Sequence, residues 1–276
     1  MRCVITGLSL AWLCLGAAIP ASTEDDARSI VTVELTDPSG PCWVHCSLPT
    51  GSITVRAGEA GKVIVEAVSR PESPPSERAE PGGALKRIPV TFSELTVEEL
   101  ENVVQVDTHS FYRPVDVSIT VPVLTSLRLR SRDSGDFLIE GVNGEIDLEN
   151  RGGAITLQGV SGTVVAYTLQ GDIVAEIVEA TPKKPMSFAS LNGDLDITLP
   201  SAVQATVRIK SSRGEVYSDF AIEDAEVRQI EEEPARDSEG VFRAHVERVF
   251  SGKINGGGPE FQFHAYHGTI YIRRGQ

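Results

Sequence analysis

The amino-acid sequence predicts an all-β protein. The expected architecture is a β-solenoid, a parallel β-helix-like stack whose turns of about 18 residues hold two short strands each. The main observation is a run of glycines spaced nine residues apart, each followed by alternating apolar side chains. A second is that alternating segments rich in β-branched residues fill most of the remaining chain, with almost no helical pattern. A β-sandwich of repeated strands is the alternative architecture.

Five glycines define the repeat. Apolar side chains stand two and four places after each glycine, and an alternation of period two puts both on one face of a short strand. Glycine can adopt a positive φ, so each is expected to mark the turn that begins a strand. Segment 140–144 recurs as 158–162, which makes the predicted unit 18 residues long. Such a unit cannot bury its own apolar face and is expected to stack. The repeat glycines are Gly135, Gly144, Gly153, Gly162 and Gly171.

Shorter β elements continue on both sides of this repeat. The same pattern of glycine, polar residue and alternating apolar residues recurs at 51–55, 193–197, 214–217 and 268–272. Further β-like runs are found at 29–35, 62–68, 103–107, 115–121, 126–130, 206–210, 242–250 and 260–266. The only helix candidate is 96–100, where Thr96 and Glu99 have the spacing of a capping box.

The N-terminus has the pattern of a signal peptide, predicted to span residues 1–21. Arg2 precedes an apolar run over 4–18, and Ala21 is a small residue at the expected cleavage point. About 15 apolar residues are fewer than the ~20 that a membrane-spanning helix needs. We therefore expect no transmembrane span in the mature chain, and export to the periplasm, the cell surface or the medium.

Two parts are predicted to follow the signal peptide. Residues 22–112 form an N-terminal β-rich part that is interrupted by a proline-rich loop at 70–89, and residues 113–276 form the β-strand-repeat domain. Segment 223–240 is strongly acidic. Both it and 70–89 are expected to be exposed, mobile loops.

Composition narrows the class of partner. The chain of 276 residues has a formal net charge of −14, so attraction to nucleic-acid phosphates or anionic lipid headgroups is unfavourable. We expect no nucleic-acid partner. Apolar residues make up 41% and charged residues 23%, which is the ordinary range for globular proteins and argues against wholesale disorder.

Two cysteines, Cys42 and Cys46, remain after removal of the signal peptide. In an oxidising compartment they could form a disulfide. Residues four apart on a regular strand are about 13 Å apart, so a bridge requires a local turn. A local disulfide and two free thiols both remain open. Zinc binding by these cysteines with His45 is disfavoured, because no further ligand pair stands elsewhere.

The chain shows no signature of catalysis or of cofactor binding. Acidic residues after repeat glycines, such as Asp136 and Asp172, alternate with Ala154 and Thr163, so they cannot form the ligand ladder of a calcium-binding β-roll. No nucleophile elbow, phosphate-binding loop or dinucleotide fingerprint occurs. We therefore assign no catalytic residue, no cofactor and no metal.

Several motifs accompany the repeat from residue 113 to the C-terminus. They are Arg113-Pro114-Val115-Asp116 before Ile119-Thr120-Val121-Pro122, Lys184-Pro185-Met186-Ser187-Phe188 with Leu191-Asn192-Gly193-Asp194, Gly214-Glu215-Val216-Tyr217-Ser218-Asp219-Phe220, and Ile254-Asn255-Gly256-Gly257-Gly258-Pro259-Glu260. Together with the nonamer ladder, these motifs resemble the bacterial exported β-strand-repeat domains of unknown function, a family of inferred adhesins. The resemblance implies a solenoid-like parallel β-fold and an envelope or surface location, and it transfers no catalytic residue.

The expected function is therefore non-enzymatic. We expect an exported, adhesin-like module or envelope scaffold that binds an uncharacterised cell-envelope or surface protein or glycan. One alternative is a carbohydrate-active enzyme of β-helix type, which a groove lined by carboxylates with an adjacent Arg or Lys would favour. Another is an envelope-stress regulatory protein.

Overall fold

The computed structural model describes residues 28–70, 95–108, 113–231, 235–236, 242–243 and 246–275. The predicted signal peptide and nearly all of the proline-rich loop at 70–89 lie outside these residues. Every regular element among the described residues is a β-strand, which confirms the all-β prediction. Twenty strands form one continuous sheet, and β18 (Ala235–Arg236) pairs separately with β19 (Phe242–Arg243).

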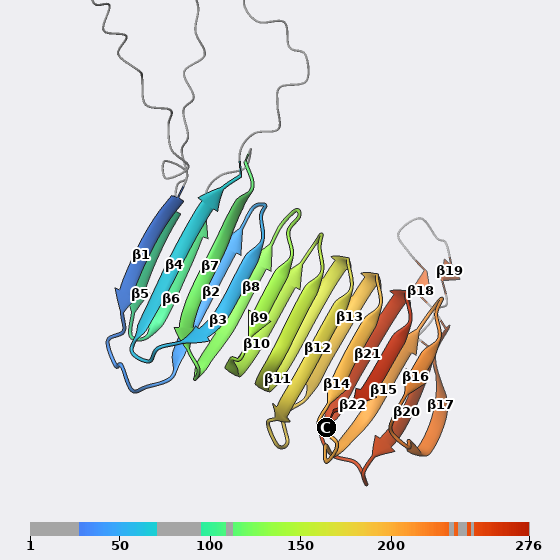
Figure 1. Ribbon diagram of the computed structural model, residues 1–276. Helices are drawn as coiled ribbons and strands as arrows, with labels where there is room; N and C mark the ends of the chain where they lie inside the picture. The colour runs from blue at the N-terminus through green and yellow to red at the C-terminus, as the bar shows by residue number, and fades with distance from the viewer. Residues whose placement is uncertain are drawn as a thin grey trace, which may run out of the picture.

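The continuous sheet folds into two layers, which we call side 1 and side 2 (Figure 1). Strand β11 (Ile155–Gln170) joins them, because its first half pairs on side 2 and its second half on side 1. Along the stack, side 1 consists of β5 (Leu95–Leu100), β6 (Val103–Thr108), β2 (Cys42–Leu48), β8 (Thr125–Ser131), β10 (Asn143–Asn150), β11, β13 (Met186–Asn192), β21 (Glu260–His267), β15 (Ala205–Ser211), β20 (Val246–Ile254) and β17 (Glu223–Glu231).

Side 2 runs beside it in the same direction. Its strands are β1 (Arg28–Glu34), β4 (Lys62–Ser69), β7 (Val115–Pro122), β3 (Ile53–Gly58), β9 (Phe137–Glu140), β11, β12 (Ile173–Ala180), β14 (Leu195–Leu199), β22 (Ile270–Arg274) and β16 (Val216–Ser218). The alternating apolar side chains of both sides point inward and form one continuous core between them.

One coil of the stack is a side 1 strand, a turn and a side 2 strand, and successive coils pair in parallel. Gly144 lies opposite Gly162 in the β10–β11 pair, and Ile155 lies opposite Ile173 in the β11–β12 pair. Partners are 18 residues apart in both pairs, which confirms the predicted repeat unit. The predicted inward columns are buried: Phe137, Ile139, Ile146, Leu148, Ile155, Leu157, Val164, Ala166, Ile173 and Ala175. The protein is a β-solenoid.

The order of coils in space differs from their order in the sequence (Figure 1). The blue coil β2/β3 lies between the coils β6/β7 and β8/β9, and the red coil β21/β22 lies between β13/β14 and β15/β16. Strands from 22–112 therefore pair directly with strands from 113–276, and both parts share one stack.

Glycine at the corner between side 1 and side 2 allows the coils to approach closely. Gly153 has φ +131°, and a Cβ built on it would lie 2.3 Å from the carbonyl oxygen of Gly135 in the preceding coil. Gly171 stands in the same relation to Gly153, at 2.2 Å. No side chain fits at such a distance, so this corner requires glycine. Its members, in order along the stack, are Gly51, Gly135, Gly153, Gly171, Gly193, Gly268 and Gly214.

The predicted helix at 96–100 is wrong, because these residues form strand β5, antiparallel to β6. The capping-box carboxylate has a different task. Glu99 Oε1 accepts hydrogen bonds from the backbone N–H of Asn102, at 2.9 Å, and from Thr36 Oγ1, at 3.0 Å. These hydrogen bonds, led by that from Asn102, lower the pKa of Glu99. A short segment gains more from pairing with an existing sheet edge than from an isolated helical turn.

The acidic segment 223–240 is only in part the predicted loop. Its first residues form β17, which pairs antiparallel with β20 and completes side 1 at the C-terminal end of the stack. The sequence masks this strand because its exposed acidic residues hide the alternation. Residues 232–234 and 237–240 lie outside the described residues.

Strand β2, absent from the predicted strands, carries both cysteines. Its burial alternates strictly, so Cys42 and Cys46 both point into the core while His45 points outward. The two thiols are free, and the possible disulfide is absent because a regular strand holds them about 13 Å apart. Burial raises the pKa of Cys42 to about 11 and raises that of Cys46 as well. The same alternation keeps Cys42, His45 and Cys46 from converging on a metal ion.

In the part of the chain described by the structure, no helix has the length and apolar character needed to cross a membrane.

Substituting the corner glycine tests the stacking geometry. Gly153→Ala should lower the free energy of unfolding by about 3 kcal/mol, because the new Cβ meets a backbone oxygen at a φ that L-residues avoid. Gly159→Ala is the matched control, since Gly159 also has a positive φ but nothing lies within 4 Å of its Cβ position. It should cost only about 1 kcal/mol. Urea unfolding of both variants measures the difference, and equal losses would contradict the close approach.

Thiol reactivity tests the state of β2. Cys42 and Cys46 should both resist iodoacetamide at pH 8 in the folded protein, because they are buried and their raised pKa values disfavour the thiolate. Both should react fully once the protein is unfolded without reductant. Mass spectrometry counts the added groups. An unfolded protein that needs a reductant before it reacts would show that the two cysteines are bridged.

Candidate functional site

The acidic residues that recur after repeat glycines support the stack. Asp136 Oδ1 accepts the backbone N–H of Ala154 at 2.9 Å. Asp172 Oδ1 accepts that of Asp194 at 2.8 Å, and Asp194 Oδ1 that of Thr269 at 2.7 Å. Each carboxylate thus holds the turn of the next coil, which gives these residues a structural role.

A second column of polar residues lies inside the same corner, and sequence reasoning missed it. The buried Asn150 donates through Nδ2 to the carbonyl oxygen of Gly135 at 2.7 Å. Thr168 and Ser190 donate in the same way to Gly153, at 3.2 Å, and Gly171, at 3.0 Å. A polar residue three places before a repeat glycine is the signal that could have revealed the column.

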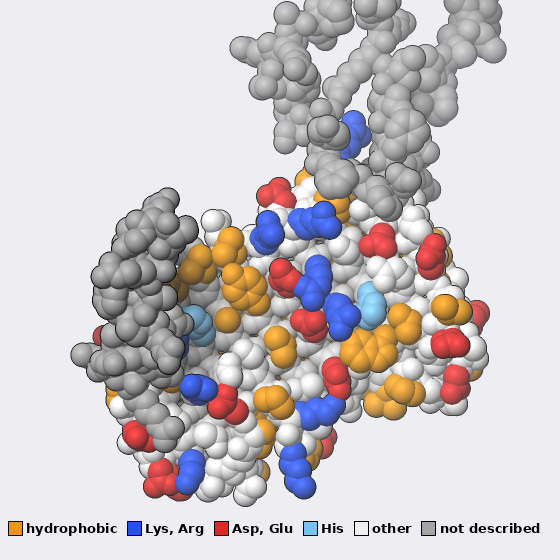
Figure 2. Space-filling view, turned by 180° about the vertical axis from the view of Figure 1, so that it is seen from behind, with side chains coloured by type: hydrophobic (Ala, Val, Ile, Leu, Met, Phe, Trp, Pro, Cys, Tyr) orange, Lys and Arg blue, Asp and Glu red, His pale blue; other side chains and the backbone are white. Residues whose placement is uncertain are grey.

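The outer surface of side 1 carries a ladder of opposite charges across β8 and β10. Asp147 lies 3.4 Å from the Nε of Arg128 and 3.3 Å from an Nη of Arg130, and Arg130 also contacts Glu149. Figure 2 looks onto this surface, where basic and acidic side chains alternate near the middle. The local charges largely cancel, although the whole chain is acidic.

An apolar patch lies next to this ladder. It consists of Val165 and Tyr167 on β11, Leu191 on β13 and Tyr266 on β21, and their exposed fractions are 47%, 40%, 37% and 40%. Tyr167 pairs with the small Ala189, and the side chains between the rings are therefore short. Hydrophobic side chains are exposed on both flanks of the charge ladder in Figure 2. Contiguous exposed apolar side chains of this kind are typical of interaction surfaces.

The edge of the apolar patch is held by polar contacts. The rings of Tyr266 and His267 meet edge to face, with centroids 4.7 Å apart. The two ring nitrogens of His267 lie 3.1 Å from Asn192 Oδ1 and 3.1 Å from Arg213 Nη1. Because both ring nitrogens are engaged, the orientation of this histidine is fixed.

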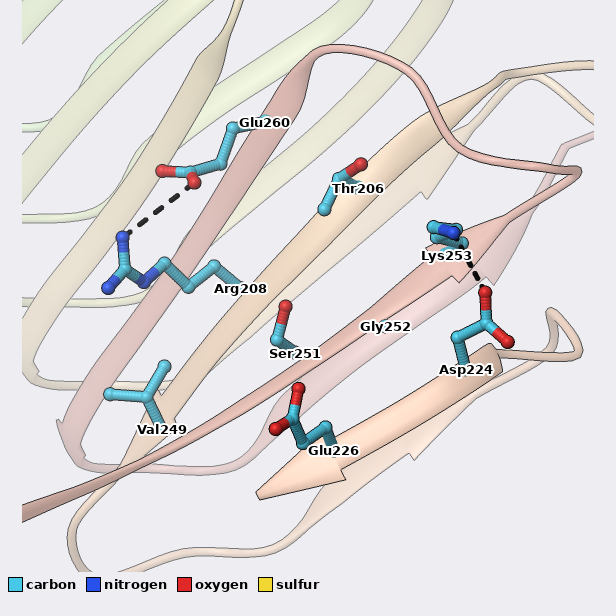
Figure 3. A pocket seen from close by; sticks show the side chains of 9 residues that line it. All are labelled: Thr206, Arg208, Asp224, Glu226, Val249, Ser251, Gly252, Lys253 and Glu260. Carbon is cyan, nitrogen blue, oxygen red and sulfur yellow. Dashed lines mark hydrogen bonds and ion pairs between the residues drawn. The ribbon is translucent and has the colours of Figure 1, made fainter. Parts of the chain in front are cut away.

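A polar groove follows at the C-terminal end of side 1 (Figure 3). Its volume is about 470 Å³. Arg208 approaches Glu260 at 3.7 Å, and Lys253 donates to Asp224 at 2.8 Å, as the dashed lines in Figure 3 show. Strands β15, β17, β20 and β21 supply its lining: Thr206, Arg208, Asp224, Glu226, Val249, Ser251, Gly252, Lys253 and Glu260. The groove needs β17, which the sequence predicted to be a loop.

The chemistry of the groove favours hydrogen bonding. Its hydroxyl, carboxylate, guanidinium and ammonium groups can donate to and accept from a polar ligand. The hydrogen bond from Lys253 lowers the pKa of Asp224, and the same contact raises the pKa of Lys253. A general acid requires the opposite shift, a carboxyl group whose pKa is raised, so Asp224 does not suit that role. Among the described residues, no three His, Cys, Asp or Glu side chains gather as metal ligands.

Comparisons with known proteins place the chain in a family. No curated protein matches it significantly. An inferred cell adhesion protein from Clostridium sporogenes ATCC 15579 matches with a TM-score of 0.44 and 13% identity, over 90% of this chain and 99% of that one. An inferred adhesin from Bacteroides fragilis NCTC 9343 matches with a TM-score of 0.42 and 11% identity, over 91% and 98%. The family model Toastrack DUF4097 matches residues 90–245, more than half of the sequence. The chain therefore belongs to the Toastrack DUF4097 family, in agreement with the resemblance to bacterial β-strand-repeat domains of unknown function.

Proposed function

We propose that the protein is a non-enzymatic binding module of the bacterial cell envelope, adhesin-like or a scaffold, which holds an envelope or surface protein or glycan on side 1. The observation that carries the proposal is the apolar patch of Val165, Tyr167, Leu191 and Tyr266 beside the polar groove. Exposed tyrosines supply large contact areas at a small cost in side-chain entropy. Export to the periplasm, the cell surface or the medium is part of the proposal and rests on the signal-peptide pattern.

The solenoid suits this role because it presents the patch on a rigid surface. Tyr167 and Leu191 stand on neighbouring parallel strands, whose backbone hydrogen bonds and buried inner faces fix their spacing. Tyr266 and Glu260 stand on the same strand, β21, so the patch and the polar groove adjoin. A surface that is ordered before binding loses little entropy when a ligand arrives.

Removing the two rings tests this proposal. The double variant Tyr167→Ala, Tyr266→Ala should retain at least tenfold less of the envelope components that the immobilised wild-type protein captures, because exposed aromatic anchors dominate binding energies. Mass spectrometry and sugar analysis of the retained material give the measurement. The matched control is Tyr217→Ala on side 2, whose ring is also exposed, at 51%. The proposal fails if the wild type retains nothing, or if the control loses as much as the double variant.

A carbohydrate-active enzyme is the second candidate, favoured by the three carboxylates beside Arg208 and Lys253 in the polar groove. The proposed binding role predicts that the wild-type protein releases no reducing sugar from a panel of polysaccharides. Release that Glu226→Gln or Glu260→Gln abolishes would establish the enzyme instead. Glu176→Gln, an exposed glutamate on β12 of side 2, is the control that should leave any such release intact.

A further inference from the structure

The structure assigns an anion-binding site to a second cavity of side 1, and we propose that it takes a phosphate, sulfate or carboxylate group of an acidic glycan. This inference rests on the proposed binding function and names its class of ligand. The cavity has a volume of about 410 Å³. Its lining residues, which we call the arginine cavity, are Ser47, Arg130, Ser131, Arg132, Glu149 and Arg151.

Three neighbouring coils bring these residues together. Ser47 on β2 lies opposite Arg130 on β8, which in turn lies opposite Glu149 on β10. Arg132 and Arg151 directly follow the ends of β8 and β10, at the start of the glycine corner. The stacking of coils therefore collects three guanidinium groups that are spread over residues 130–151 in the sequence.

The arginine cavity has an excess of positive charge in an acidic protein. Its lining holds three guanidinium groups against the single carboxylate of Glu149, whereas the whole chain has a net charge of −14. Arg130 contacts both Asp147 and Glu149. The guanidinium groups of Arg132 and Arg151 make no hydrogen bond or ion pair with any residue that the structure describes. Their donors are available to a ligand, and a guanidinium fork matches the oxygens of a carboxylate or phosphate.

Hydroxyl groups complete the donor set. Ser131 is only 3% exposed, and within the described part of the chain its Oγ has no hydrogen-bond partner. An unsatisfied buried hydroxyl is costly and is usually explained by a missing partner. Asp107, which pairs with Ser47 across β6 and β2, accepts a hydrogen bond from Gln105 at 3.0 Å. It is the carboxylate that a bound anion would have to tolerate on that flank.

The neighbouring surface favours a glycan over a dense polyanion. Glu149 in the arginine cavity lies opposite Tyr167 of the apolar patch. An acidic glycan combines widely spaced charges with sugar rings whose apolar faces can lie on tyrosine rings. A nucleic acid carries one charge per phosphate, and repulsion from the rest of this acidic chain opposes it.

Defined polymers test the site on the whole mature protein. Dextran sulfate and polygalacturonate should bind in a calorimeter, whereas uncharged dextran should not. Arg132→Gln and Arg151→Gln should each weaken binding about tenfold, because a hydrogen bond to a charged group contributes roughly that much. Arg151→Lys should lose less, since it keeps the charge and loses only the fork. The matched control is Lys183→Gln, which removes the same charge at an exposed position after β12 and should leave the affinity unchanged.

Each contrary outcome has a distinct meaning. Equal weakening by Lys183→Gln would show a general charge effect and overturn the site. Binding of sodium sulfate alone, with no binding of either polymer, would overturn the glycan. If the arginine variants bind both polymers normally while the double tyrosine variant still loses its envelope ligand, the arginine cavity is wrong and the proposed function stands. Thermal unfolding of each variant verifies that the fold is intact.

Discussion

Coils of this protein can lie against one another only because the residue at the corner has no side chain. At Gly153 and Gly171 the carbonyl oxygen of the preceding coil occupies the space where a Cβ would stand. The hydrogen bonds of the parallel strands, the carboxylates that hold the next turn and the buried polar column all depend on this approach. The same constraint sets the direction of every strand, since two strands joined by such a corner must leave it on opposite sides of the core.

The ends of the stack show how the solenoid stays finite. Strand β5 closes side 1 at one end and β17 at the other, and both are antiparallel additions to a parallel sheet. Exposed acidic side chains stand on both, including Glu98 on the first and Glu223 and Glu226 on the second. Unpaired strand edges invite association with other chains, and like charges at the two ends oppose end-to-end stacking. The acidic composition thus has a structural consequence in addition to excluding nucleic acid.

Function is separated from stability in this architecture. The inward residues of each strand form the core, and the outward residues of side 1 are free to vary without disturbing it. Three features follow one another along that surface: the arginine cavity, the apolar patch and the polar groove. Strand β10 carries Glu149 beside Tyr167, and β21 carries both Tyr266 and Glu260, so adjacent features share strands. An extended ligand could contact more than one of them on a rigid backbone.

Local pattern determined much of this protein from sequence alone. The 18-residue unit, the inward columns from Phe137 to Ala175 and the corner glycines could be predicted, because period and glycine spacing are properties of neighbouring residues. The tertiary structure decided that β2 and β3 lie among later coils, that 96–100 is a strand, and that part of 223–240 closes side 1. It also decided the three features of side 1, whose residues are far apart in the sequence. The physical reason is that backbone hydrogen bonds are the same for every pair of strands. The choice of neighbour depends on how whole coils pack, and a single chain's sequence shows no local sign of it.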